Sequence, residues 1–91
     1  MKTFEHEFVT ETVDMIETGF NLRKIREAKK FSVNRVSDYL GISPQAIYNW
    51  EIGKSALNIN HLVTICNLYD TTFNDLVKTK KVTAVCREYD E

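Results

Sequence analysis

The 91-residue sequence has few of the residues that interrupt helices and no long apolar run. Three glycines and one proline leave long stretches between them that can be helical. The longest apolar runs are only a few residues, and the N-terminus lacks the basic and apolar regions of a signal peptide. The sequence therefore predicts no transmembrane span, no membrane partner and a cytoplasmic location.

Residues with the chemistry of catalytic or metal sites are also scarce. Cys66 and Cys86 read as reduced thiols, and His6 and His61 are isolated from any second ligand at metal-binding spacing. Neither a phosphate-binding glycine loop nor a nucleophile elbow is present. We expect no metal, no cofactor, no catalytic residue and no small-molecule substrate. A single domain of this length has no room for a deep cavity, which favours binding at the surface over an enzyme.

Charge is unevenly distributed along the chain. Residues 1–18 contain one lysine and five acidic residues, whereas residues 19–77 contain seven basic and five acidic ones. Such asymmetry is compatible with a polyanion-binding module that carries an acidic extension, and equally with ordinary solvated helix faces.

The middle of the chain predicts five helices, so the expected fold class is all-α. Apolar residues recur there at intervals of three and four, and residues that favour helix starts stand before most of the segments. The expected helices run from about Asp14 to Lys30, from the cap Ser32 to Gly41, from Ser43-Pro44 to Ile52, and onward from the caps Asn58 and Thr72. The expected apolar positions include Ile16, Leu22, Val36, Tyr39, Ile47, Ile59, Ile65, Tyr69, Phe73 and Leu76.

Both ends of the chain alternate in the manner of β-strands. Residues 3–9 and 82–89 contain β-formers bounded by polar residues. These segments either pair with each other or with a second chain, or they are frayed termini. The expected organisation is an acidic N-terminal arm (1–13), a helical domain (14–78) and a C-terminal tail (79–91), both extensions being candidate strands.

Residues 33–52 follow a helix-turn-helix pattern, in which two helices meet at a glycine-containing turn. Ser37 supplies the small residue where the backbones cross, and Gly41 tolerates a positive φ at the bend. Apolar residues behind the crossing fix the angle between the helices: Val36, Leu40, Ile42, Ile47 and Trp50.

Residues 20–77 resemble the Xre family of bacterial and phage regulators, the fold of the lambdoid repressors and Cro. The resemblance rests on residues 21–26, 39–43, 46–54 and 62–76, taken in order and spacing. It implies a five-helix lambda-repressor-like DNA-binding domain that binds double-stranded DNA with sequence specificity. It also implies a homodimer on a pseudo-palindromic operator, and control of transcription.

In this resemblance the helix from Pro44 to Ile52 enters the major groove. Gln45 and Asn49 would read base edges, because an amide offers a donor and an acceptor together. Pro44 and Ala46 could touch thymine methyl groups.

Phosphate contacts would come from Ser43, Lys54 and, more weakly, Arg35, whereas Tyr48 either reaches a phosphate or lies across the surface. Arg26 would bridge to Glu51 and turn its remaining N–H groups towards a phosphate. Three positions lack the family's usual polar or basic residues: Val33, Ile52 and Ala56-Leu57. We therefore expect weak or salt-sensitive DNA binding, and a protein-protein adaptor of antitoxin or anti-repressor type stays open as the alternative.

Overall fold

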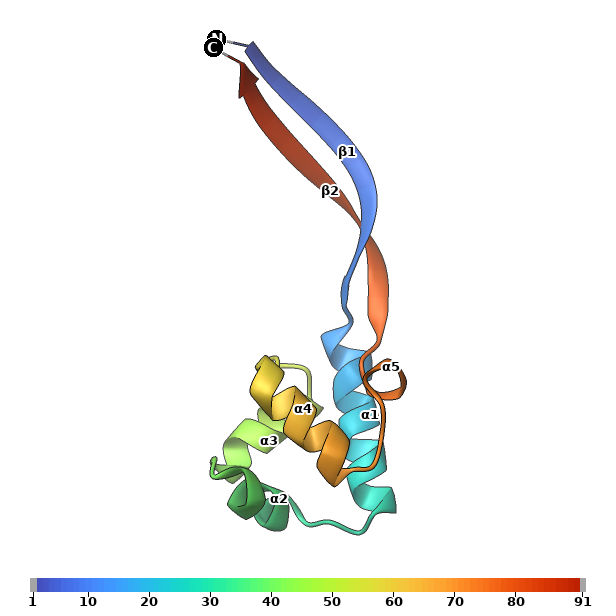
Figure 1. Ribbon diagram of the computed structural model, residues 1–91, viewed down its shortest axis with the longest axis vertical. Coiled ribbons are helices and arrows are strands. Elements are labelled where there is room, and N and C mark those ends of the chain that lie inside the picture. The colour runs from blue at the N-terminus through green and yellow to red at the C-terminus, as the bar shows by residue number, and fades with distance from the viewer. Residues whose placement is uncertain (1, 91) are drawn as a thin grey trace.

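Five helices and a two-stranded ribbon make up the part of the chain that the computed structural model describes, the backbone of residues 2–90 and the side chains of residues 7–84. Figure 1 shows the helices gathered into one body from which the ribbon projects, along a molecule that measures 57 × 22 × 20 Å. The elements are β1 (Lys2–Val13), α1 (Met15–Ala28), α2 (Val33–Leu40), α3 (Pro44–Glu51), α4 (Ile59–Leu68), α5 (Phe73–Leu76) and β2 (Thr79–Asp90).

Each helix begins where a side-chain oxygen accepts a backbone N–H of the first turn. The four caps predicted from the sequence are confirmed, and Asp14 caps α1 in the same way. The oxygens of Ser32, Ser43, Asn58 and Thr72 lie 3.1, 3.3, 2.8 and 3.2 Å from their donors. Pro44 occupies the first position of α3, where a missing N–H leaves no bond unmade.

The core of the helical body is a single cluster of buried apolar side chains. Its members come from all five helices and from the residue after α4: Leu22, Val33, Val36, Ile47, Trp50, Ile65, Tyr69 and Leu76. Four of the apolar positions recognised from the spacing, Ile16, Tyr39, Ile59 and Phe73, lie outside this cluster and are 68%, 64%, 75% and 55% exposed. Ile16, Tyr39 and Ile59 lie on a different side of their helices from the buried residues, and α5 is only one turn long.

The all-α label holds for the helical body alone, because the candidate strands at both ends of the chain do form. β1 and β2 pair with each other as an antiparallel ribbon, from Lys2 opposite Asp90 to Val13 opposite Thr79. Both strands extend several residues beyond the segments 3–9 and 82–89, because the β-branched residues near the helical body continue the ladder. Frayed termini are therefore excluded as the conformation of residues 2–13 and 79–90.

The ribbon is attached to the helical body at its root. The backbone N–H of Asp14 donates to the carbonyl of Lys78 at 2.7 Å. The hydroxyl oxygen of Thr18, a buried residue of α1, accepts the N–H of Lys78 at 3.0 Å. These bonds fix the direction in which the ribbon projects from the start of α1.

Two sequence expectations concern features that the structure describes only in part. Cys66 is a free, half-buried thiol, and its burial raises its pKa above the ordinary value. The side chains of Cys86 and His6 lie outside the described residues. Within the described helices, none combines the length and the hydropathy needed to cross a bilayer.

Candidate nucleic-acid interface

α2, the turn at residues 41–43 and α3 form the predicted helix-turn-helix. Ser37 is buried, and its hydroxyl donates to the carbonyl of Asn34 at 2.9 Å. Gly41 has φ 70°, and both Gly41 and Ile42 donate their backbone N–H groups to the carbonyl of Ser37, at 2.9 and 3.1 Å. The left-handed conformation is one that glycine adopts without strain, so Gly41 has the positive φ that was predicted for the bend.

α3 has one face in the core and the other in solvent. Ile47 and Trp50 are 2% and 7% exposed, and the Trp50 ring lies 5.3 Å from the imidazole of His61 on α4. Four of the residues that the sequence analysis singled out for DNA lie away from this core: Pro44, Gln45 and Tyr48 are exposed and Asn49 is half-buried. Ala46 is half-buried beside them.

The amide side chains of Gln45 and Asn49 form a hydrogen-bonded pair on the outer side of α3. Gln45 Nε2 donates to Asn49 Oδ1 at 3.0 Å. Residues four apart on a helix are neighbours, so the spacing predicted their common face. The bond itself was not predicted. It leaves Gln45 Oε1 and the Asn49 Nδ2 donors free for a ligand, together with the second hydrogen of Gln45 Nε2 and the second lone pair of Asn49 Oδ1.

An ion pair joins the C-terminal end of α3 to α1. Arg26 Nε donates to Glu51 Oε2 at 2.7 Å and Arg26 Nη2 donates to Glu51 Oε1 at 3.1 Å, which confirms the predicted bidentate pair. The two side chains are 11% and 4% exposed. The hydrogen bond to Glu51 raises the pKa of Arg26 above its ordinary value, although burial opposes this. Such a pair fixes the position of α3 relative to α1.

The burial of Arg26 bears on the phosphate contact expected of it. Besides the two bonds to Glu51, Arg26 Nη1 donates to the carbonyl of Phe31 at 2.9 Å. These bonds use three of its five N–H groups and position α3, and the phosphate contact expected of the two that remain stays a prediction.

A close backbone contact that the sequence analysis missed also orients α3. A Cβ added to Gly19, in the second turn of α1, would lie 2.5 Å from the carbonyl oxygens of both Trp50 and Glu51. Only glycine permits α1 and the end of α3 to come this close. The signal available in the sequence was an isolated glycine within a helical pattern, which can mark close packing.

The other expected phosphate contacts lie in solvent. Ser43, Lys54 and Arg35 are exposed, and Tyr48 is 48% exposed. Lys54 follows α3 in a loop held by its own N–H, which donates to the carbonyl of Asn49 at 2.8 Å. The Arg35 guanidinium lies 5.3 Å from the centre of the Phe31 ring. The structure therefore places Ser43 directly before α3, Tyr48 on it and Lys54 in the loop after it, while Arg35 lies on α2.

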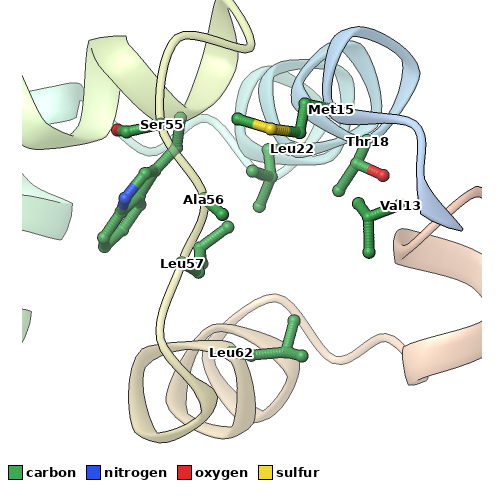
Figure 2. A pocket seen from close by; sticks show the side chains of 9 residues that line it. Val13, Met15, Thr18, Leu22, Ser55, Ala56, Leu57 and Leu62 are labelled. Carbon is green, nitrogen blue, oxygen red and sulfur yellow. The ribbon is translucent and has the colours of Figure 1, made fainter. Parts of the chain in front are cut away.

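Behind α3, an apolar pocket of about 70 Å³ opens between the start of α1, the loop at residues 55–57 and α4. Figure 2 shows Leu22 and Met15 on one side of it and Leu57 and Leu62 on the other. Ligand pockets are usually several hundred Å³, so this is a gap in the packing on the core side of α3.

The helix-turn-helix and its surrounding helices are similar to those of known proteins. A helix-turn-helix family model matches residues 22–76. YonR of Bacillus subtilis strain 168, an uncharacterized HTH-type transcriptional regulator derived from prophage SPbeta, is 33% identical over 60 residues, which cover 66% of this chain and 56% of that protein. The chain thus spans little more than half the length of that curated relative.

Solved structures share the fold at lower identity. The restriction-modification controller protein C.AhdI from Aeromonas hydrophila superposes with a TM-score of 0.63 at 21% identity, covering 69% of this chain and 96% of that one. Part of Fe(II)-HppE, crystallised with the alternative substrate (S)-1-HPP, gives a TM-score of 0.65 at 24% identity, covering 76% of this chain and 35% of that one. At these identities the likeness concerns the fold alone. The family model, by contrast, spans more than half of the sequence, and the chain belongs to the helix-turn-helix family that this model describes.

Proposed function

We propose that this protein is a transcriptional regulator that binds double-stranded DNA with sequence specificity through α3, without catalysing a reaction. The observation that carries the proposal is the outward amide pair of Gln45 and Asn49 on a helix fixed from behind by the core and the Arg26–Glu51 pair. α3 also begins with an exposed N-terminal turn, as in helices that enter the major groove.

The chemistry of the amide pair suits an adenine. Adenine presents a donor at N6 and an acceptor at N7 in the major groove. In the proposed complex Gln45 Oε1 accepts from N6 while Asn49 Nδ2 donates to N7, so the two side chains read one base together. Such bidentate recognition discriminates by roughly 1–3 kcal/mol. Pro44 and Ala46 would then contact neighbouring thymine methyl groups.

Affinity would come from contacts to phosphates around α3. Ser43, Tyr48 and Lys54 supply them in the proposal, with Arg35 as a further cation. Val33 and Ile52 supply no phosphate contact, because Val33 is buried and Ile52 is an exposed aliphatic side chain. A single domain buries only about 600–1,000 Å² on DNA. We therefore propose that two copies bind one pseudo-palindromic site.

The test is to select bound duplexes from a random library, using the wild-type protein and the double variant Gln45→Ala/Asn49→Ala. The expected result is an enriched sequence for the wild type and a loss of preference in the variant. The variant should keep its fold, because Gln45 is exposed and Asn49 is only half-buried. The control is Asn60→Ala/Asn67→Ala, which removes two exposed amides from α4 and should keep the preference. Unchanged selectivity in the α3 variant would contradict the proposal.

A protein-protein adaptor is the second candidate. It is favoured by the exposed apolar side chains of Ile52 and Ile59 and by the scarcity of cations around α3. Titration with random duplex DNA at about 50 and about 200 mM salt separates the two, because release of counterions makes DNA binding fall steeply with salt. Binding that disappears between these concentrations supports the regulator, whereas no binding at the lower one supports the adaptor.

A further inference from the structure

The two amides on α3 depend on different atoms of the adenine that they are proposed to read. Gln45 Oε1 accepts a hydrogen of the N6 amino group, whereas Asn49 Nδ2 donates to N7. In a Watson–Crick pair one N6 hydrogen bonds to thymine and only the other points into the major groove. The contact of Gln45 therefore depends on a single hydrogen of the base.

A methyl group on N6 replaces this hydrogen. The N6 hydrogen that bonds to thymine has to remain for the base pair to form, so the methyl group takes the position on the N7 side, in the major groove. Gln45 Oε1 then meets a carbon atom where a donor stood. An acceptor buried in an interface without a donor has lost its bonds to water and gained none in return. The methyl group also crowds the approach of Asn49 to N7.

The side chains of the pair have little freedom to avoid the methyl group. Gln45 Nε2 is bonded to Asn49 Oδ1 at 3.0 Å, so moving Gln45 away breaks this bond. The backbone of Asn49 is held in turn by the loop after α3. Its carbonyl accepts the N–H groups of Lys54 and Ser55 at 2.8 and 3.3 Å. The point from which the Asn49 side chain leaves the helix is therefore fixed.

α3 as a whole is also prevented from retreating. Its C-terminal end is bonded to α1 by the buried pair of Arg26 and Glu51, and the carbonyl of Glu51 lies against Gly19. The residue that follows the C-cap makes a second close contact with α1, because a Cβ added to Gly53 would lie 3.1 Å from the Cα of Ile16. A shift of α3 would disturb the buried ion pair, which is costly.

We propose that α3 binds its site tightly only while the adenine facing Gln45 carries no methyl group on N6. An enzyme that methylates this adenine then releases the protein from DNA. In that reaction N6 takes the methyl group of a methylsulfonium donor, which leaves as a thioether, and N6 loses one proton. The inference rests on the proposed function, since it requires that the amide pair reads an adenine. It adds the chemical state of the DNA that is recognised.

The experiment measures the affinity of the full chain for the duplex most enriched in the selection from the random library, at one salt concentration. Each adenine is replaced in turn by N6-methyladenine and, in a second series, by 7-deazaadenine, which keeps the N6 amino group but lacks the N7 acceptor. At the adenine that α3 reads, both replacements should weaken binding, N6-methyladenine by at least about tenfold. Methylation of adenines outside the contacted bases is the control and should leave the affinity unchanged.

Two single variants assign the effect to one side chain. Gln45→Leu replaces the amide by an apolar group of similar size and should bind the methylated and unmethylated duplexes equally, because no acceptor is left to lose its donor. Asn49→Ala is the matched variant. It should bind both duplexes more weakly than the wild type does but still discriminate against the methylated one. Far-ultraviolet circular dichroism checks that both variants remain folded.

The outcomes separate this inference from the proposed function. If 7-deazaadenine weakens binding at some adenine while N6-methyladenine at the same position leaves it equal or tighter, the inference is overturned and the proposed function stands. A methyl effect that persists in Gln45→Leu also overturns the inference, because another group would then sense the methyl. If 7-deazaadenine has no effect at any adenine, or if no duplex is enriched at all, the reading of adenine by the pair is overturned, and the inference with it.

Discussion

The helical body and the ribbon are equally regular in backbone but bury their apolar side chains very differently. In the body, Ile65, Tyr69 and Leu76 are at most 1% exposed, whereas Phe8, Val9 and Val13 in the ribbon are 49%, 70% and 43% exposed. Each hydrogen bond adds little net stability, so the stability of the two regions depends mainly on how much apolar surface each one buries. The comparison teaches that the body contains its own source of stability, whereas none of the described side chains of the ribbon is buried.

The largest expected effect comes from breaking the buried ion pair of the body. Glu51→Ala leaves the Arg26 charge without its partner in a largely buried site and should lower the free energy of unfolding by about 3–5 kcal/mol. The matched control is Glu27→Ala, which removes an exposed pair with Arg23 (2.6 Å, 65% and 55% exposed) and should cost less than about 1 kcal/mol. Urea unfolding followed by helical circular dichroism measures both, and equal midpoints would refute the assignment.

Closing the gap between α1 and α3 should have the next largest effect. Gly19→Ala gains up to about 1 kcal/mol of helix propensity, but the new methyl meets two backbone carbonyls at 2.5 Å. Overpacking of this kind costs roughly 1–3 kcal/mol, so a net loss of stability is expected. Thr64→Ala, at a partly buried position of α4, is the control. A Gly19→Ala protein more stable than the wild type would show that the contact is not tight.

Alkaline pH offers a smaller, graded test of the body. Burial, and then the nearby Glu51 carboxylate, raise the pKa of Tyr69 well above its ordinary value of 10.0. The unfolded chain therefore releases this proton near pH 10 while the folded chain keeps it. Stability present below pH 10 should fall above it by up to about 1.4 kcal/mol per pH unit. Tyr69→Phe should reduce that slope, and an identical slope in unfolding titrations of both proteins would count against it.

The smallest expected effect sharpens the contrast with the ribbon. Amide exchange in β1 and β2 should be faster than in α1 and α4, because no described side chain of the ribbon is buried, whereas α1 and α4 contribute to the buried cluster. Mass spectrometry of peptides from both regions measures this in one sample. Equal exchange in the ribbon and in these helices would remove the distinction between the two regions.

Local signals predicted the helical body well. A cap is a contact between residues three apart, so Ser32, Ser43, Asn58 and Thr72 could be recognised without knowing the fold. The exposure of Ile16, Tyr39 and Ile59 could not be recognised in this way. Periodicity shows that a helix is amphipathic but does not show which of its apolar residues the neighbouring helices cover. The close approach at Gly19 depends on where α3 ends in space, which no local pattern contains.

The candidate site, too, could be predicted only in part from the sequence. The resemblance identified the Arg26–Glu51 pair, and helical spacing placed Gln45 and Asn49 on one face. The bond between these amides follows from side-chain rotamers, so the atoms that they offer to a base emerged only from the structure. Their roles at DNA stay predictions, as do those of Pro44, Ala46, Ser43, Tyr48, Lys54 and Arg35.

The bonds of Thr18 and Asp14 to Lys78 attach the ribbon to the start of α1, and Gly19, one residue after Thr18, lies against the end of α3. The first two turns of α1 therefore set both the direction in which the ribbon projects and the position of α3.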